Sequence, residues 1–182
     1  MTALVVALVG TDHHPFDRLV TWVDAAAARH PEVRFLVQHG SASRAPVLAE
    51  GQEFLTHARL AALLAEATVV ICHGGPGTIL DARDAGHVPL CVPRDPRLCE
   101  HVDGHQQRFA ETVGRAGVVR PIGSLEELFD QLDQALTQGR AQEQAAPVTR
   151  VRDTARARLA AELDQLITIR PYRLSRRTRA SL

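Results

Sequence analysis

Residues 68–86, TVVICHGGPGTILDARDAG, determine the fold that we expect for the rest of the chain. The first five residues are apolar or β-favouring and predict a buried strand over 68–72. The glycine-rich residues 73–77 cannot continue that strand, and from Thr78 to the stop signal Gly86 the spacing is that of a helix. A strand that enters a helix through glycines exposes unpaired N–H groups at the positive end of the helix dipole, which favours an anion.

Diphosphate is the anion that this turn predicts. Glycines at such a turn can also serve only to reverse the chain direction. Three glycines in four positions, followed by the Thr78 hydroxyl in the first helical turn and Asp81 one turn later, favour phosphate and ribose. The loop is not a Walker A motif, which needs a lysine that this chain lacks, and the dinucleotide fingerprint belongs after the first strand.

Strands and helices alternate along the chain. The apolar runs predict strands at 4–9, 33–37, 68–72, 89–92 and 118–119, with a loop at 38–54 that has room for one more short strand. Helices are expected at 18–29 after an Asp17 cap, at 57–67 after Thr56, from Thr78, from Asp103, and at 125–136 behind a Ser124–Glu127 capping box. This alternation predicts an α/β fold with a doubly wound parallel sheet, which binds ligands at the carboxyl ends of its strands. Gly10, Gln38, His73 and Pro93 lie at those ends.

Composition limits the classes of partner. The 182 residues carry 21 basic and 21 acidic side chains, and this balance argues against a nucleic-acid binder. One Trp, one Tyr and five Phe are too few for a groove that stacks bases. Three cysteines cannot all pair with one another, so we expect reduced thiols, as in the cytoplasm. No basic segment resembles a signal peptide, and no apolar run is long enough to span a membrane. We therefore expect a cytoplasmic protein.

Charge divides the chain into two parts. Residues 147–182 hold nine arginines against Asp153, Glu162 and Asp164. We expect a ligand-binding domain at 1–146, then a last helix at 149–169 and an arginine-rich end, with 147–182 docking on a partner or on anionic lipid headgroups.

The motifs HGGPGT with Asp81, VPR, EHVDGHQQ and the opening VGTDHHPFDRL resemble the donor-binding half of the GT-B glycosyltransferases. More narrowly, residues 4–136 resemble the glycosyltransferase family 28 C-terminal domain. That domain forms a separate subunit in bacterial exopolysaccharide and capsule synthesis and in the eukaryotic lipid-linked N-acetylglucosamine transferase. The resemblance implies a Rossmann-like single GT-B half that takes a UDP-sugar donor. A membrane-associated partner subunit would hold the lipid-linked sugar acceptor.

The same resemblance implies roles for individual residues. Gly75, Gly77 and Thr78 would hold the diphosphate, with His73 and Gly74 in the same loop and Gly10 and Thr11 closing the far side. Asp81 would bind the ribose, one methylene shorter than the glutamate common there. Glu100, Asp103 and Gln106 would face the sugar hydroxyls. Arg94 is either a counter-charge for the diphosphate or a solvated loop residue. His14, or its neighbour His13, is a candidate base for the acceptor hydroxyl, which the partner could equally supply.

A metal site is the alternative for His101 and His105, which stand four residues apart with Asp103 between them. Helical histidines at this spacing can bind zinc, but the metalloprotease motif needs Glu directly after the first His, whereas Glu100 precedes it. The resemblance implies that helix dipoles and basic groups, and not a cation, stabilise the leaving diphosphate. We therefore expect no metal and no cofactor.

Two other functions stay open. One is a nucleotide-sugar binding or regulatory module without catalysis. The other is half of a UDP-sugar epimerase, which has a similar fold and glycine loop but needs both halves in a single chain of about twice this length.

Overall fold

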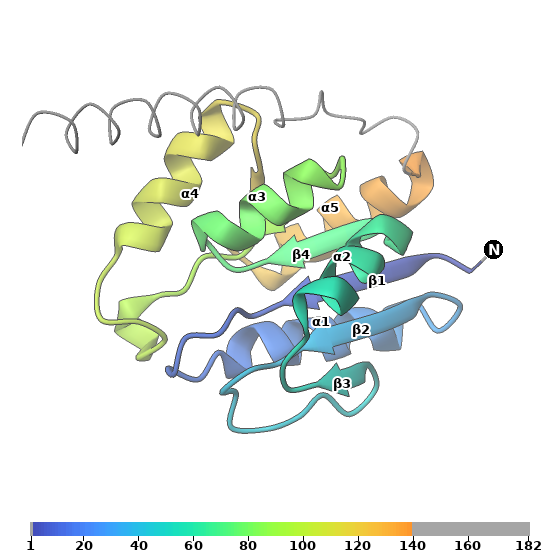
Figure 1. Ribbon diagram of the computed structural model, residues 1–182, viewed down its shortest axis with the longest axis horizontal. Coiled ribbons are helices and arrows are strands. Elements are labelled where there is room, and N and C mark those ends of the chain that lie inside the picture. Colours follow the sequence, from blue (N-terminus) through green and yellow to red (C-terminus); the bar gives the residue numbers. More distant parts are fainter. Residues whose placement is uncertain (1, 140–182) are drawn as a thin grey trace, which may run out of the picture. The chain divides into compact units, whose positions relative to one another are not determined.

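A computed structural model describes residues 2–139 of the chain, so the predicted helix 149–169 and the arginine-rich end lie outside the described residues. The described part contains one six-stranded, all-parallel sheet in the order β3-β2-β1-β4-β5-β6 (Figure 1). The strands are β1 Leu4–Leu8, β2 Arg34–Gln38, β3 Glu50–Gln52, β4 Val69–Cys72, β5 Leu90–Cys91 and β6 Arg120–Pro121. This arrangement confirms the predicted doubly wound, Rossmann-like α/β fold.

Helices connect the strands and cover both faces of the sheet. They are α1 Asp17–Arg29, α2 His57–Glu66, α3 Pro76–Asp84, α4 His105–Arg115 and α5 Leu125–Gln138, with a short 3-10 helix at Pro96–Leu98. Alternate residues of β1 point to opposite faces, so Val5 and Ala7 pack with α1 and α5, whereas Val6 and Leu8 pack with α2. Burial on both faces explains why β1 and β4 are apolar throughout.

Two of the predicted helix starts have the expected caps. The Thr56 hydroxyl accepts a hydrogen bond from the Arg59 N–H at 3.3 Å, and the Ser124 hydroxyl accepts one from the Glu127 N–H at 3.1 Å. The Glu127 carboxylate accepts from the N–H of Gly123, one residue before the cap. Capping chemistry of this kind is local, which is why the sequence alone locates it.

Asp17 is the first residue of α1 and not its cap. Its carboxylate turns away from the helix end and accepts a hydrogen bond from the Ser43 N–H at 2.7 Å, which ties down the loop after β2. That loop leads into β3, the short strand for which the sequence left room between residues 38 and 54.

Three elements begin two residues away from their predicted starts. Helix α3 begins at Pro76 and not at Thr78, because proline suits the first helical position, where an N–H would have no partner. Helix α4 begins at His105, two residues after the predicted start, because the Asp103 carboxylate accepts from the His105 N–H. The last strand lies at β6 and not at 118–119, because the Val118 N–H bonds back to the Val113 carbonyl.

No helix within residues 2–139 combines the length and apolar character that crossing a bilayer requires.

Candidate functional site

Two glycine turns meet at the carboxyl ends of neighbouring parallel strands. Leu8 at the end of β1 pairs in register with Cys72 at the end of β4, and this pair stands where the strand order changes direction. Ligands of doubly wound sheets bind at this switch point. A cavity of about 280 Å³ opens here, lined by Leu8, Gly10, Thr11, Gln38, Leu55, Leu60, His73, Gly75, Pro76, Gly77 and Thr78. It contains six of the predicted site residues: Gly10, Thr11, His73, Gly75, Gly77 and Thr78.

His73 fills the space between the two turns. A Cβ atom on Gly10 would lie 2.5 Å from His73 Cε1, and one on Gly75 would lie 2.2 Å from His73 Nε2. Gly10 also has φ +86°, a conformation that favours glycine. Burial, followed by the positive charge of Arg94, lowers the pKa of His73 from 6.5 to about 4, so the imidazole is neutral at pH 7. Both glycines are therefore required by the packing of His73.

The first turn of α3 faces this cavity through Gly77 and Thr78. Gly75 is its N-cap and has no side chain to cap the helix, while Pro76 has no N–H to offer. The N–H groups of Gly77 and Thr78 precede the first intrahelical bond, which runs from the Ile79 N–H to the Gly75 carbonyl at 3.2 Å. A Cβ atom on Gly77 would meet nothing within 4 Å. The helix terminus therefore presents donors to an open space that fits an anion.

Gln38 is a cavity residue to which the sequence analysis gave no role. Its side chain is buried, and its amide bonds to the backbone of Gly10 and donates to the Glu53 carbonyl at 3.0 Å. A glutamine at the end of the otherwise apolar run FLVQ was the signal that could have identified it.

Arg94 joins the loop after β1 to the loop after β5. Its guanidinium is 1% exposed and donates to the carbonyls of Val9 at 2.9 Å, His14 at 2.7 Å and Glu100 at 2.9 Å. The arginine is thus not a solvated loop residue, which was one of the two expectations. The other expectation, direct contact of Arg94 with diphosphate, stays a prediction. Such a contact would have to compete with backbone carbonyls, because both Nη atoms already donate to them.

Glu100 also lies in this brace and does not line the cavity. Its buried carboxylate accepts two bonds from Arg18, at 2.9 and 2.7 Å, and one from the Asp95 N–H at 2.8 Å. The predicted contact of Glu100 with a sugar would have to compete with these three donors.

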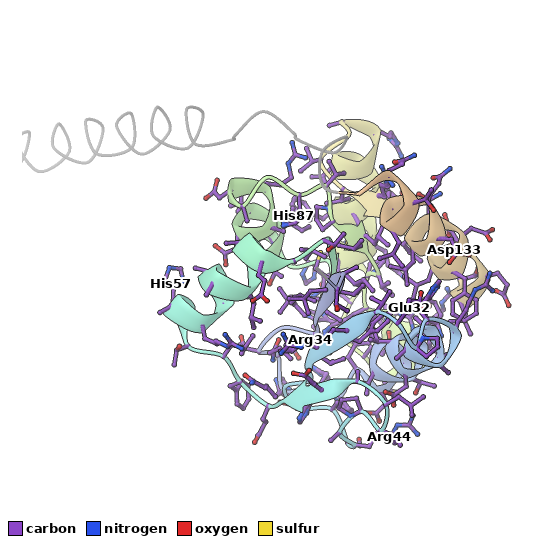
Figure 2. All side chains as sticks on the ribbon, turned by 90° about the vertical axis from the view of Figure 1, so that its right-hand side faces the viewer. Glu32, Arg34, Arg44, His57, His87 and Asp133 are labelled. Carbon is purple, nitrogen blue, oxygen red and sulfur yellow. The ribbon has the colours of Figure 1, made fainter. Side chains whose placement is uncertain are left out.

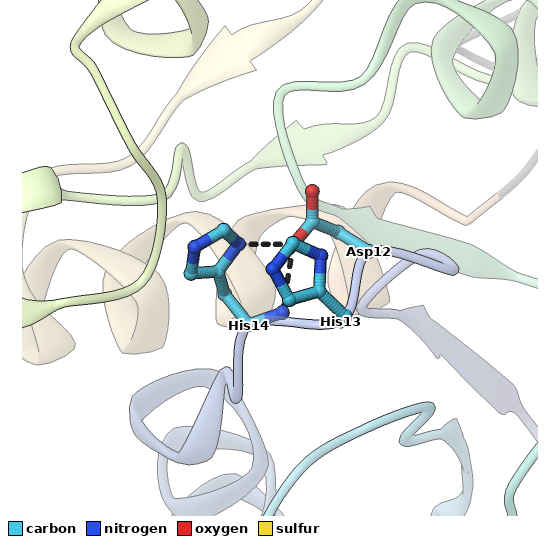
Figure 3. Close-up of side chains that lie close together, drawn as sticks. All are labelled: Asp12, His13 and His14. Carbon is cyan, nitrogen blue, oxygen red and sulfur yellow. Dashed lines mark hydrogen bonds and ion pairs between the residues drawn. The ribbon is translucent and has the colours of Figure 1, made fainter.

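Asp12, His13 and His14 form a histidine–aspartate cluster in the loop after β1 (Figure 3). Asp12 Oδ1 accepts from the backbone N–H of His14 at 2.8 Å and lies 2.6 Å from His14 Nδ1. Partial burial opposes ionisation of Asp12, but these two hydrogen bonds and the Arg94 charge lower its pKa to about 2. Asp103 and His105 repeat the same Asp-x-His turn on the other loop, and their contact lowers the pKa of Asp103. His101 lies between the two turns, with Nε2 3.6 Å from Asp12 Oδ2.

Gln106 and Asp81 lie next to the glycine loop and outside the cavity lining. A Cβ atom on Gly74 would come within 3.0 Å of Gln106 Cβ, and the buried Gln106 Oε1 has no hydrogen-bond partner among the described residues. Asp81 is half-buried in the second turn of α3. The contacts of Gly74, Asp81, Asp103 and Gln106 with a ligand stay predictions, as does the role of His14.

The fold and this site define a Rossmann-like α/β domain with its ligand cavity at the switch between β1 and β4. The chain belongs to the family described as the glycosyltransferase family 28 C-terminal domain, whose model matches residues 4–163. It is a glycosyltransferase-type domain of the kind that binds a nucleotide sugar. The match confirms the predicted family and continues past residue 136, where the resemblance read from the motifs ended.

Solved structures support the GT-B fold. The calicheamicin glycosyltransferase CalG4 has 18% identity and a TM-score of 0.55, over 90% of this chain and 43% of that one. The glycotransferase of kitacinnamycin has 19% identity and a TM-score of 0.56, over 73% of this chain and 34% of that one. The solution structure of ALG13 has 19% identity and a TM-score of 0.51, over 80% of this chain and 88% of that one. The chain thus spans less than half of the first two proteins. A search of curated proteins gave no match.

Proposed function

We propose that this chain is the donor-binding subunit of an inverting glycosyltransferase, which binds a UDP-sugar and transfers its sugar to a lipid-linked acceptor. A membrane-associated partner subunit would hold the acceptor, and the chain would work in the cytoplasm at the membrane surface. The observation that carries the proposal is the cavity between the two glycine turns, into which the first turn of α3 points.

The diphosphate of the donor would occupy this cavity. The N–H groups of Gly77 and Thr78 and the Thr78 hydroxyl are donors on one side, and the helix dipole adds about half a positive charge. Gly10 and Thr11 line the other side. Because His73 is neutral at pH 7 and Arg94 is bound to backbone, the charge of the diphosphate would be met mainly by backbone donors.

The nucleoside would lie against the apolar part of the same cavity, which Leu55 and Leu60 line, with Asp81 as the predicted ribose ligand. A volume of about 280 Å³ is at the low end of ligand pockets, which usually measure roughly 300–1,000 Å³. A cavity of this size suits one half of a binding site that a second protein half completes around the ligand.

Transfer with inversion is a single displacement at the sugar. The acceptor oxygen bonds to the anomeric carbon, the bond from that carbon to the diphosphate oxygen breaks, and UDP leaves with the bonding electrons. His14 would take the acceptor proton: if Nδ1–H donates to Asp12, Nε2 is left as a free acceptor. The ionised Asp12 would then stabilise the imidazolium that forms.

We propose a partner because the described residues form one GT-B half, and a donor half alone has no surface on which to hold the acceptor against the sugar. The matched region covers 34% and 43% of two glycosyltransferases, but it covers 88% of ALG13. We extend the proposal to residues 147–182, whose arginines would dock on the partner or on anionic lipid, leaving 1–146 as the donor domain.

Calorimetric titration of the purified chain with UDP, UDP-sugars and other nucleotide sugars tests donor binding. UDP compounds should bind, and Asp81→Ala should weaken UDP binding by about 1–3 kcal/mol through loss of a charge-assisted contact. If neither Asp81→Ala nor Gly77→Ala changes UDP affinity, the UDP site lies elsewhere on the chain.

Turnover separates the alternatives. With its partner and a lipid acceptor the chain should transfer sugar, whereas alone it should be nearly inactive. A chain truncated after Ala146 should keep its UDP affinity and lose most turnover. UDP-sugar binding without transfer under any of these conditions would indicate a binding module, and release of an epimerised sugar would indicate an epimerase-like domain.

A further inference from the structure

Three imidazoles converge on one carboxylate at the rim of the site. His14 Nδ1 lies 2.6 Å and His13 Nδ1 3.8 Å from Asp12 Oδ1, and His101 Nε2 lies 3.6 Å from Asp12 Oδ2. Asp12, His13 and His14 follow β1, whereas His101 follows β5 and is at least 87 positions further along the chain. Asp12, His13 and His14 thus form one group of potential metal ligands, and the second loop brings His101, from the neighbouring group with Asp103 and His105, to the other oxygen of Asp12.

We propose that Asp12, His13, His14 and His101 bind one divalent transition-metal ion, with Zn²⁺ as the best fit. Three imidazole nitrogens and one carboxylate oxygen form a four-ligand set of the chemical type that zinc takes. Ligand atoms that each lie about 2 Å from a shared zinc are on the order of 3 to 4 Å apart. The distances from Asp12 Oδ1 to His13 Nδ1 and from Asp12 Oδ2 to His101 Nε2 fall in this range, so the carboxylate would use both oxygens or turn toward one ion. The ion would replace the proton shared between Asp12 and His14.

The protein already holds the two loops together. Arg94 Nη1 donates both to the His14 carbonyl at 2.7 Å and to the Glu100 carbonyl at 2.9 Å, so one buried guanidinium fixes the residue before His101 beside His14. The rings of His14 and His101 have centroids 5.7 Å apart. An ion would therefore meet ligands whose backbones are braced before it binds.

Asp103 lies behind the His101 ring. Its backbone N–H donates to His101 Nδ1 at 3.4 Å, so the nitrogen on the side away from Asp12 is already held, and the His101 side chain is 11% exposed. The Asp103 carboxylate oxygen Oδ1 lies 3.9 Å from the same nitrogen, beyond hydrogen-bond distance. His105 contacts the same Asp103 oxygen and completes the second turn.

This site differs from the one considered from sequence. The spacing of His101 and His105 suggested two ligands on a single helix, but α4 begins only at His105, and His101 faces the other loop. The absence of a metal was expected on catalytic grounds, and the ion proposed here is inhibitory. If His14 is the base of the proposed function, a bound cation lowers the basicity of its ring and stops proton transfer.

Titration of the tag-free, full-length chain with Zn²⁺ and with Co²⁺ tests the site without any donor or partner. We expect one ion per chain and visible Co²⁺ absorption typical of nitrogen and oxygen ligands. Asp12→Asn and His101→Gln should each weaken binding at least tenfold. His57→Gln removes a histidine at the start of α2 that belongs to no group of potential metal ligands among the described residues, and it should bind like the parent (Figure 2). Cys99→Ser should do the same, which excludes the exposed thiol as a ligand.

Circular dichroism in a chelator establishes that each variant is folded. Equal affinity of His101→Gln and His57→Gln, or no binding below about 0.1 mM, would overturn the proposal. Inhibition is measured separately: Zn²⁺ should stop sugar transfer by the assembled enzyme and leave UDP affinity within twofold. If Zn²⁺ binds but does not inhibit, His14 is not the base, and the ion site stands. If Zn²⁺ stops transfer in the His101→Gln variant but not in the parent, the ion at this site is not the inhibitor.

Discussion

The Gln38 side-chain amide pairs with both backbone polar groups of Gly10. The Gly10 N–H donates to Gln38 Oε1 at 3.1 Å, and Gln38 Nε2 donates to the Gly10 carbonyl at 3.0 Å. Gly10 lies two residues after the end of β1, beyond the last backbone bond from the Val9 N–H to the Gln38 carbonyl, so this amide extends the pairing of β1 with β2. The pairing fixes the turn that lines one side of the cavity.

Gln38→Leu is therefore expected to weaken both the fold and the site. The substitution keeps the size of the side chain but leaves buried backbone groups unpaired, which costs about 1–3 kcal/mol of unfolding free energy. UDP affinity should fall at least fivefold, because the turn loses its fixed conformation. Chemical denaturation and calorimetry measure the two effects, with Gln134→Leu on the exposed side of α5 as the control. Parent-like UDP affinity in a destabilised Gln38→Leu protein would remove Gln38 from the site.

The two glycines at the start of α3 should respond differently to alanine. At Gly77 a methyl group meets nothing within 4 Å, so Gly77→Ala should fold like the parent and gain up to about 1 kcal/mol of helix stability. The same methyl enters the space proposed for diphosphate, and we expect UDP affinity to fall at least tenfold.

At Gly75 the added atom would lie 2.2 Å from His73 Nε2. Gly75→Ala should therefore lower the melting temperature as well as ligand affinity, because His73 must move. Calorimetry and thermal melting of both variants check this contrast. If Gly77→Ala binds UDP as the parent does, no phosphate lies against the first turn of α3.

The sequence predicted those parts of the protein that depend on local chemistry. The apolar run of β4, the glycines after it and the caps at Thr56 and Ser124 each involve neighbours in sequence, and each lies where it was expected. Six residues of the cavity lining were predicted. The glycines and Thr78 after β4 indicated an anion site, and the resemblance to the glycosyltransferase family implied the roles of Gly10, Thr11 and His73.

The contacts that the sequence could not predict all join distant segments. Arg94 is followed by turn-forming residues and reads as a surface arginine, yet it is buried against Val9 and His14, which are 85 and 80 positions away. Gln38 and the approach of His101 to Asp12 likewise depend on how the loops pack over the sheet. Nothing in local spacing encodes these distances.

His73 should make stability depend on pH between about 6.5 and 4. Its folded pKa of about 4 lies below the ordinary value of 6.5, so the unfolded chain binds a proton that the folded chain excludes. His73 does not affect the free energy of unfolding above about pH 6.5, and stability declines as the pH falls below that value. The loss amounts to about 3 kcal/mol at pH 4. Urea unfolding at several pH values measures the free energy of unfolding, which should change less steeply with pH in His73→Asn than in the parent. Parallel curves would mean that His73 titrates normally in the folded protein.

Gln106 should recognise the sugar and leave the nucleotide unaffected. Its Oε1 is buried beside Gly74 and has no partner among the described residues, and a buried acceptor of this kind is costly unless a ligand or water satisfies it. A sugar hydroxyl next to the diphosphate would donate to it. Gln106→Ala should therefore lower affinity for the correct UDP-sugar about five- to twentyfold, equivalent to about 1–2 kcal/mol, and change UDP affinity less than twofold.

The neighbouring Gln107→Ala serves as the control, since Gln107 is only half-buried. Calorimetry with UDP and UDP-sugar gives both affinities for each variant. Equal losses for the two ligands in Gln106→Ala would mean that the residue braces the glycine loop through Gly74 and does not contact the sugar.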